Sequence, residues 1–408
     1  MKLLINIGGD ILNREDFPLL EQDIIYFDNG ATSLKPRILS ETISDYYNNY
    51  SANAHRGDYD LSLKVDTLYE DTRKKVKEFV NARSIKEIVF TSGTTDSINK
   101  IVFGYFKYNL NEKDEIILTK SEHASNILPW MELSDELNLK IKYIDLDENN
   151  SVTLDNLKKI INSNTKVISL ALITNVIGDI RPIKEIVEYA HKNNILVVGD
   201  AAQSIAHMKT DVIDLDIDFL AFSAHKMYGP TGVGILYAKE ELLNNMKPTS
   251  FGGGMNAMFS SDGIRLYSDI PALFEAGTQN IAGIIGFGKI IDYLNNIGMS
   301  NISKYENELT IYAINELNKL DGINIINKNI KGSIITFNYK DIFAQDLAIY
   351  LNKYNICLRA GNHCTKMLKE VIGIKNTCRI SLSFYNTKEE IDRLIEILKN
   401  PNIKEEII

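Results

Sequence analysis

Short apolar runs rich in β-branched residues alternate with longer amphipathic stretches through the middle of this chain. Seven such runs predict strands, at Glu87–Thr91, Glu115–Thr119, Lys140–Ile144, Lys166–Ala171, Ile195–Asp200, Phe219–Ser223 and Gly232–Tyr237. Helices are predicted between them, among others at Thr94–Tyr108, Leu154–Asn162 and Ile183–Lys192. Most of the runs are apolar on both faces, as in a parallel sheet covered by helices. The pattern predicts an α/β fold whose large domain holds a mostly parallel seven-stranded sheet between helices.

The pattern changes after Gly286. Helices are predicted at Phe287–Asn295, Ser303–Leu320, Ala344–Tyr354 and Lys388–Leu398, and strands at Ile323–Ile326, Gly332–Asn338, Ile356–Ala360 and Thr377–Phe384. We therefore expect a large domain at 51–286 and a smaller C-terminal α/β domain at 287–408. Residues 1–50 are expected to pack on the small domain and across the interface. Ligands of such sheets bind beyond the carboxyl ends of the strands, which predicts a site between the two domains.

Composition narrows the class of protein. The chain has 408 residues, of which 44% are hydrophobic and 24% charged, and this excludes disordered and low-complexity classes. A net charge of −9 provides no global positive field to attract nucleic acid. No apolar run reaches the ~18 residues of a membrane-spanning helix, and the start lacks the features of a secretory signal. The three cysteines fit neither a disulfide framework nor a zinc spacing, so we expect a cytoplasmic protein without a metal site.

The most informative segment runs from Ser223 to Gly232 and carries Lys226 directly after a predicted strand. A lysine that is desolvated there is able to form a Schiff base, although an isolated lysine is usually a solvated surface residue. Asp200 ends the preceding predicted strand. A lysine and an aspartate at neighbouring strand ends fit pyridoxal phosphate. Lys226 would hold the aldehyde as an imine, and Asp200 would keep the ring nitrogen protonated.

Other polar residues are expected at the same edge of the sheet. Thr94 and Thr95 begin a helix after Gly93, where free N–H groups and the helix dipole favour a phosphate. Threonine at a helix start is otherwise ordinary capping. The chain contains neither a phosphate-binding Gly-Lys-Ser/Thr loop nor a three-glycine dinucleotide fingerprint, which disfavours nucleotides. Gln203 lies about one turn past Asp200 and is a candidate donor to the ring hydroxyl. His123 is a candidate to stack on the ring and exchange protons.

Together with Ala52–Gly57 and Phe274–Thr278, these segments resemble the class V aminotransferase branch of pyridoxal-phosphate enzymes. Within that branch the chain is most similar to the group II, Suf-type cysteine desulfurases, from about Phe17 to Lys399. The resemblance implies a pyridoxal-phosphate-dependent transferase of fold type I. It also implies a homodimer in which Thr278 reaches the phosphate bound by the other subunit. Ser223, His225 and Asn175 join the cofactor-binding residues on the same basis.

The segment Leu358–Lys366 resembles the group II loop that carries the sulfur-accepting cysteine, and this implies Cys364 as the nucleophile. A thiol beside His363 and small turn residues is also a candidate for partial exposure and ionisation. Cys357 and Cys378 lie in β-rich runs and are interpreted as inert core thiols.

Arg379 matches the family arginine that binds the substrate carboxylate, and its planar fork suits a bidentate grip. By resemblance Arg359, His55 and Asn175 join the substrate pocket. The chain departs from the family pattern at Asn362, Met367, Ser92 and Ala124.

The resemblance implies that L-cysteine takes the place of Lys226 on the cofactor, that Cys364 attacks its sulfur, and that alanine leaves. The resulting persulfide would pass to a Suf-type acceptor protein or a small thiol, with iron–sulfur cluster assembly as the destination. Alternatives within the family are a selenocysteine lyase that uses L-selenocysteine, a kynureninase-like hydrolase, and an aminotransferase, which needs no Cys364. A different class is an inactive sulfur-transfer scaffold. It is disfavoured because the chain has the lysine, aspartate, cysteine and arginine that the chemistry requires.

Overall fold

The computed structural model describes residues 14–55, 57–327, 332–373 and 376–406. The start of the chain, where no secretory signal is predicted, and Arg56 lie outside this part. A seven-stranded sheet forms the larger lobe, in the order β2-β8-β7-β6-β5-β3-β4. Its strands are β2 (Ile88–Thr91), β3 (Glu115–Thr119), β4 (Lys140–Ile144), β5 (Thr165–Ala171), β6 (Leu196–Asp200), β7 (Phe219–Ser223) and β8 (Gly234–Ala238). Only β8 runs against the other strands of this sheet, so the prediction of a mostly parallel seven-stranded sheet is confirmed.

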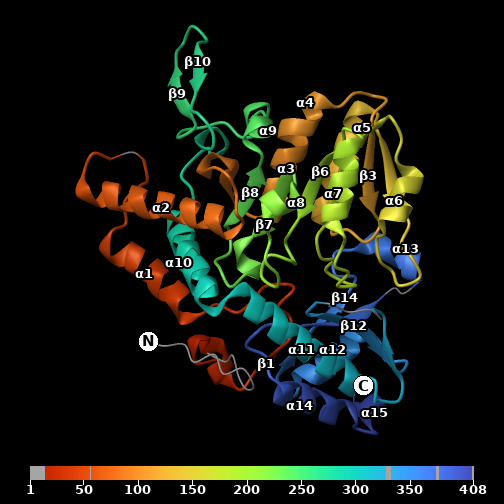
Figure 1. The fold of residues 1–408 in the computed structure, drawn as a ribbon. Coiled ribbons are helices and arrows are strands. Elements are labelled where there is room, and N and C mark those ends of the chain that lie inside the picture. The colour runs from red at the N-terminus through yellow and green to blue at the C-terminus, as the bar shows by residue number, and fades with distance from the viewer. Residues whose placement is uncertain (1–13, 56, 328–331, 374–375, 407–408) are drawn as a thin grey trace.

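Helices cover both faces of this sheet (Figure 1). They are α3 (Thr94–Ile101), which continues through a π-helical turn (Val102–Phe106) into α4 (Lys107–Asn109), and α5 (Leu128–Leu137), α6 (Leu154–Ile160), α7 (Ile183–Lys192), α8 (Val212–Leu215) and α9 (Glu240–Asn244). Along β3, Ile116 and Leu118 belong to one buried cluster and Ile117 to the other. This alternation explains why the strands are apolar on both faces, since each face is packed against helices.

Helix α10 (Ile281–Ile297) lies against α1 (Arg37–Asn49) and α2 (Asp60–Phe79) (Figure 1). A Cβ atom at Gly286 would lie 2.8 Å from Leu39 Cδ1, and one at Gly288 would lie 2.4 Å from Thr72 Oγ1. Glycine permits this close packing but weakens the helical pattern in the sequence, and the prediction that this helix starts only at Phe287 is wrong. The expected domain limit at 286/287 falls inside α10, whose buried side chains on both sides of it belong to one cluster.

The smaller lobe contains a four-stranded antiparallel sheet, in the order β11 (Ile323–Ile325), β12 (Ile334–Tyr339), β15 (Thr377–Ser381) and β14 (Arg359–Gly361). Its helices are α11 (Met299–Leu317), α12 (Ala344–Asn352), α13 (Lys369–Ile372), α14 (Lys388–Leu398) and α15 (Ile403–Glu406). The single strand predicted at Ile356–Ala360 is wrong. The chain changes partner there, because β13 (Ile356–Cys357) pairs with β1 (Ile25–Tyr26) while β14 pairs with β15.

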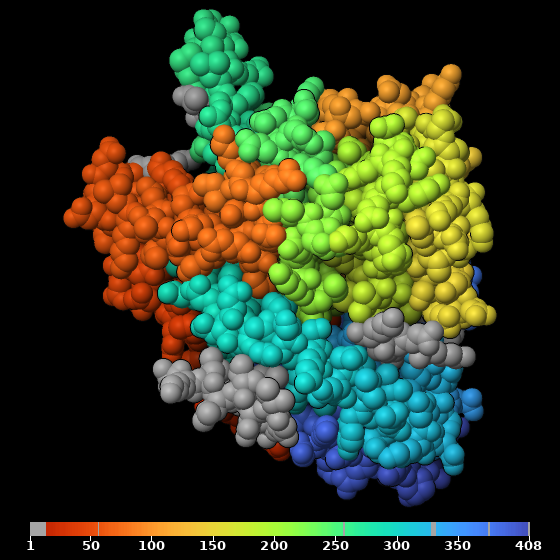
Figure 2. Space-filling model, in the orientation of Figure 1, coloured from red at the N-terminus to blue at the C-terminus, as the bar shows by residue number. Residues whose placement is uncertain are grey.

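The N-terminal segment thus adds a short strand to the smaller lobe before it enters α1. A hairpin of β9 (Asn256–Phe259) and β10 (Arg265–Tyr267) stands out from the larger lobe (Figure 2). Within the described residues, none of the helices combines the length and apolar character needed to cross a bilayer.

Candidate active site

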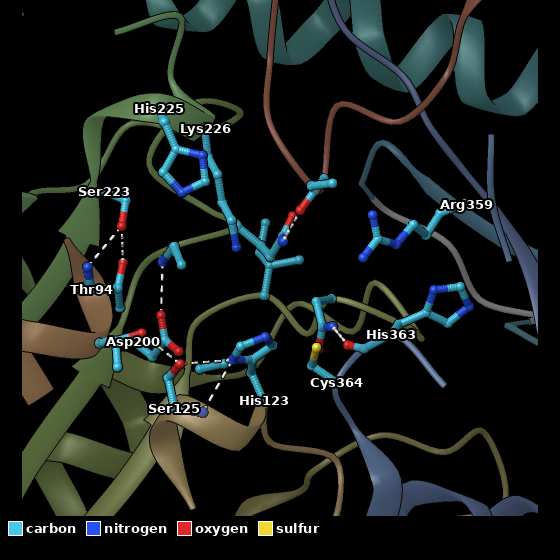
Figure 3. A pocket seen from close by; sticks show the side chains of 18 of the residues that line it. Thr94, His123, Ser125, Asp200, Ser223, His225, Lys226, Arg359, His363 and Cys364 are labelled. Atoms are coloured by element: carbon cyan, nitrogen blue, oxygen red, sulfur yellow. Dashed lines mark hydrogen bonds between the residues drawn. The ribbon is translucent and has the colours of Figure 1, made fainter. Parts of the chain in front are cut away.

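A cavity of about 350 Å³ lies between the carboxyl ends of the parallel strands and the smaller lobe. Twelve of the side chains predicted for the site line it: Thr94, Thr95, His123, Asn175, Asp200, Gln203, Ser223, His225, Lys226, Arg359, Cys364 and Arg379. They come from segments far apart in the chain, and Lys226, His123 and Cys364 point toward one common space (Figure 3). The residues predicted to bind cofactor and substrate and to accept sulfur therefore share one cavity.

Lys226 lies in the turn after β7, and Asp200 is the last residue of β6, the neighbouring strand. Burial lowers the pKa of the Lys226 amine, and Asp200 acts in the opposite direction. Burial also raises the pKa of the Asp200 carboxyl to about 6, while the Ala202 N–H, 2.9 Å from Asp200 Oδ1, lowers it. The site therefore favours a neutral amine, which is the nucleophilic form of lysine.

Hydroxyl groups and a helix start form an anion site at one end of the cavity. Thr94 N donates to Ser223 Oγ at 2.7 Å, and the Thr95 hydroxyl lies 2.8 Å from that of Ser125. The residue before α3 is Gly93, which provides no side chain to cap the helix. The free N–H groups of this helix start and the hydroxyls suit the phosphate of pyridoxal phosphate.

The N-terminal segment holds the turn that carries Lys226. The His225 carbonyl oxygen accepts hydrogen bonds from Thr32 Oγ1 at 3.0 Å, from Ser33 N at 3.1 Å and from Lys35 Nζ at 2.6 Å. Ser33 Oγ also accepts from Tyr228 N at 2.6 Å. The backbone on either side of Lys226 is therefore fixed by residues about 190 positions earlier in the chain.

Cys364 follows β14 in a loop of the smaller lobe, and its side chain is exposed to the cavity. His363 and Cys364 both have positive φ, at 51° and 57°. The larger lobe holds this strained turn, because Asn175 Nδ2 donates to His363 O at 2.6 Å and Ala124 N donates to Cys364 O at 2.9 Å. These bonds position the thiol next to His123, which adjoins Ala124.

Arg379 lies on β15 and extends its buried guanidinium into the cavity wall. Nη1 donates to Asn175 O at 2.9 Å, and Nη2 donates to Asp28 Oδ1 at 3.1 Å. Arg379 Nε and His363 Nδ1 are buried without a hydrogen-bond partner among the described residues. The bonds to Asn175 and Asp28 fix the plane of the guanidinium at the cavity wall, and a guanidinium held in this way suits a substrate carboxylate.

The histidines of the cavity are held in their neutral form. Burial lowers the pKa of His123 and of His225 to about 4, and the protonated form of Lys226 acts in the same direction. Burial and Arg379 lower the pKa of His363 to about 3. In neutral His123 the nitrogen without a proton is Nδ1, which accepts a hydrogen bond from Ser125 N at 3.1 Å, so Nε2 carries the ring proton.

The other two thiols differ from Cys364 in their surroundings. Cys378 is fully buried on β15, and burial raises its pKa to about 12. Cys357 is half-buried on β13, where burial and the charge of Asp28 raise its pKa. Neither lines the cavity.

Two predicted residues lie outside the cavity of this single chain. His55 is half-exposed and is paired with Glu70, with 3.4 Å between Nε2 and Oε1. Thr278 is exposed on the segment between the hairpin and α10. Neither residue contributes to this pocket within one chain.

Several lining residues were not predicted: Gly30, Ala31, Ser125, Ala171, Ile173, Ala202 and His363. Ser125, Ala202 and His363 lie within two residues of predicted site residues, and Ala171 ends a predicted strand. Gly30 gives no such signal. It is close to the Arg379 guanidinium, where an added Cβ would lie 3.0 Å from Cζ.

Residues 25–394 match the class V aminotransferase family, and the chain belongs to that family. It is 40% identical to a "Probable cysteine desulfurase" of Halalkalibacterium halodurans, over 94% of this chain and 95% of the relative. It is 41% identical to a protein of the same description from Staphylococcus aureus strain Mu50, over the same shares.

Solved structures agree with these relatives. The cysteine desulfurase CsdA of Escherichia coli superimposes with a TM-score of 0.91 at 33% identity, over 97% of this chain and 98% of that chain. A cysteine desulfurase of Thermococcus onnurineus NA1 gives a TM-score of 0.90 at 35% identity, over 95% and 96%. Within its family the chain therefore groups with the cysteine desulfurases. The predicted resemblance and fold class are confirmed.

Proposed function

We propose that this protein is a pyridoxal-phosphate-dependent cysteine desulfurase that converts L-cysteine to L-alanine and leaves a persulfide on Cys364. The observation that carries the proposal is the convergence of three groups on one cavity: the Lys226 amine, the Asp200 carboxylate and the Cys364 thiol. An aminotransferase needs the first two and has no use for the third. The names of the relatives support the same reaction.

The larger lobe holds the cofactor in this proposal. Lys226 would bind its aldehyde, Asp200 and Gln203 would contact the ring, and His123 would stack on it. Thr94, Thr95, Ser223 and His225 would bind the phosphate. When bound, the cofactor withdraws electrons from the substrate α-carbon, which allows the carbon–sulfur bond to break.

The chain's own residues then position substrate and move protons. Arg379, assisted by Asn175 and Arg359, binds the carboxylate of L-cysteine. The Lys226 amine would take the proton from the α-carbon, because burial favours its uncharged form. His123, neutral and close to the Cys364 turn, is placed to accept or return a proton.

Sulfur transfer follows from the position of the thiol. The Cys364 sulfur attacks the substrate sulfur, a sulfur–sulfur bond forms, and the substrate carbon–sulfur bond breaks with its electrons left on the carbon skeleton. Protonation of that carbon gives L-alanine. The sum is one L-cysteine and one thiol converted to one L-alanine and one persulfide, with no outside oxidant.

We also propose the partners and the location. An acceptor thiol, on a Suf-type protein or a small molecule, takes the persulfide sulfur by exchange, and the sulfur supplies iron–sulfur cluster assembly. The three thiols are all unpaired, as expected in a reducing cytoplasm. The exposed Thr278 and His55 support a homodimer in which the partner subunit completes the site. A fully active monomer in sizing experiments would contradict this dimer.

The deciding experiment compares Cys364→Ser with Cys357→Ser, a matched control outside the cavity. Both variants should bind pyridoxal phosphate with its visible absorption band. Cys364→Ser should lose alanine formation from L-cysteine at least ~100-fold and form no persulfide, whereas Cys357→Ser should retain both. Full alanine release by Cys364→Ser would refute the mechanism. L-selenocysteine serves as a second substrate, and Cys364-independent alanine release confined to it would favour the selenocysteine lyase.

A further inference from the structure

A buried ion pair lies directly behind the wall of the cavity and has no part in the mechanism above. Arg181 comes from the loop between β5 and α7, and Glu122 from the loop after β3. Both side chains are completely buried, at 0% exposure, and Arg181 Nη1 donates to Glu122 Oε1. Such a pair must satisfy its remaining polar atoms inside the protein, or it costs stability.

The surrounding bonds fix both charges in place. Glu122 Oε2 accepts from Asn126 Nδ2 and from Ala171 N, each at 2.9 Å. Arg181 Nη2 donates to Ser121 Oγ at 2.7 Å and to Thr119 Oγ1 at 2.9 Å. Arg181 Nε has no hydrogen-bond partner among the described residues and lies 3.8 Å from Asp179 Oδ2. The other bonds tie the end of β3 to the end of β5.

The pair borders two residues of the proposed cofactor site. Glu122 directly precedes His123 in the chain. Ala171, which donates to Glu122, lies opposite Asp200 in the pairing of β5 with β6. The next residue, Leu172, donates from N to Asp200 O at 2.9 Å and accepts from Arg181 N at 3.1 Å. These bonds reach the main chain of Asp200, so both members of the pair belong to the segments packed directly beside that residue.

Charges act on Asp200 from three elements. Lys226, in the turn after β7, and Arg181 stabilise its ionised form, while Glu122 destabilises it. His123 lines the same cavity and is neutral. The charges of Arg181 and Glu122 therefore oppose each other at Asp200, inside a region where water does not screen them.

We propose that Arg181 is a positioning residue that balances the charge of Glu122 and so sets the pH up to which Asp200 and the ring nitrogen of the cofactor hold the proton between them. The inference rests on the proposed cofactor site and adds a group that does not touch the ligand. If Arg181 loses its charge, the negative charge of Glu122 is no longer balanced, and the proton between Asp200 and the ring nitrogen is held to higher pH. If Glu122 loses its charge, the effect has the opposite sign.

The test uses holoenzyme loaded with pyridoxal phosphate that carries ¹⁵N in the ring, because the ¹⁵N chemical shift reports protonation of that nitrogen. The pH midpoint of the shift is measured for wild type, Arg181→Met, Glu122→Gln and the double variant. Arg181→Met should raise the midpoint, and Glu122→Gln should lower it, each by on the order of one pH unit. The double variant should return to the wild-type midpoint, and Arg181→Lys should stay near it.

Shifts of the same sign in both single variants, or no shift in either, would overturn the proposal, because a purely structural role has no reason to change sign. If Arg181→Met yields no folded protein, Glu122→Gln and the double variant still decide, since the first must lower the midpoint and the second must restore it. Asp200→Asn provides the separate control. If it leaves the ¹⁵N signal of the ring unchanged, the proposed cofactor site itself fails, whatever the pair does.

Discussion

Lys35 offers a prediction whose size follows from the structure. Its ammonium group donates to His225 O at 2.6 Å, to Ser33 O at 2.7 Å and to Thr32 Oγ1 at 3.3 Å. No carboxylate of the described residues forms an ion pair with it. Burial without a counter-charge lowers its pKa from 10.5 to about 7. The folded protein therefore disfavours the charged form of Lys35, and the unfolded chain does not.

The sign and size of the effect follow from proton binding. Between pH 7 and pH 10.5 the unfolded state binds the Lys35 proton more tightly than the folded state, so the free energy of unfolding rises with pH. One pKa unit corresponds to about 1.4 kcal/mol. With a pKa of about 7 in the folded protein, the free energy of unfolding should rise by at most about 3 kcal/mol from pH 7 to about pH 9.5. The rest of the titration lies above that pH range.

Lys35→Met removes this contribution and leaves the other titrating groups in place. We expect urea unfolding to show a smaller rise in stability from pH 7 to 9.5 in Lys35→Met than in wild type, by about 1–3 kcal/mol. Lys192→Met removes a lysine from the exposed surface and should leave the rise unchanged. Equal pH dependence in wild type and Lys35→Met would refute the reasoning that this lysine is buried without a counter-charge.

Three further predictions follow from buried contacts. Arg73 and Glu275 form a buried pair, 2.7 Å between Nη1 and Oε1, so Arg73→Met should cost about 3–5 kcal/mol in urea unfolding and adding Glu275→Gln should recover part of it. Asn175→Ala removes the hydrogen bond that Asn175 donates to His363 O and the one that it accepts from Thr365 Oγ1. Since each bond stabilises the Cys364 turn by about 1 kcal/mol, persulfide formation in a single turnover should slow roughly 30-fold. Because the pKa values of His123 and His225 are lowered to about 4, stability of the apoprotein should fall as pH drops from 6.5 to 4, measurable by urea midpoints.

The sequence predicts the part of the fold in which burial leaves a local pattern. Strands such as β6 and β7 are apolar up to their last residue because helices cover both faces, and their limits agree with the prediction to within a residue. The sequence predicts a start of helix α10 that is too late in the chain, because its glycines lower helix propensity while they allow close contact with α1 and α2. The small strands β13 and β14 were merged, because a change of partner has no local signature.

The candidate site also combines residues that a local sequence pattern predicts with residues that only the completed fold brings together. Lys226 and Asp200 are predictable because strand ends in a parallel sheet share one edge, and Cys364 and Arg379 because their segments resemble a known family. Lys35 and Arg181 were not predicted. Lys35 acts on a carbonyl 190 residues away, and Arg181 on a carboxylate 59 residues away. Contacts between loops of this kind depend on the completed fold and on no spacing in the chain.

The loop between β5 and α7 links the two halves of the proposed chemistry. Its Asn175 holds the Cys364 turn of the smaller lobe, and its Arg181 anchors Glu122 behind Asp200. Val176 O and Ile177 O accept further bonds from Thr336 and Asn327 of the smaller lobe. Since the thiol itself belongs to the smaller lobe, its distance from the cofactor depends on how this loop holds that lobe. Removal of the Asn175 hydrogen bonds should therefore impair sulfur transfer. Removal of the Arg181 charge should instead change the protonation of the ring nitrogen of the cofactor. The two effects are separable because different hydrogen bonds carry them.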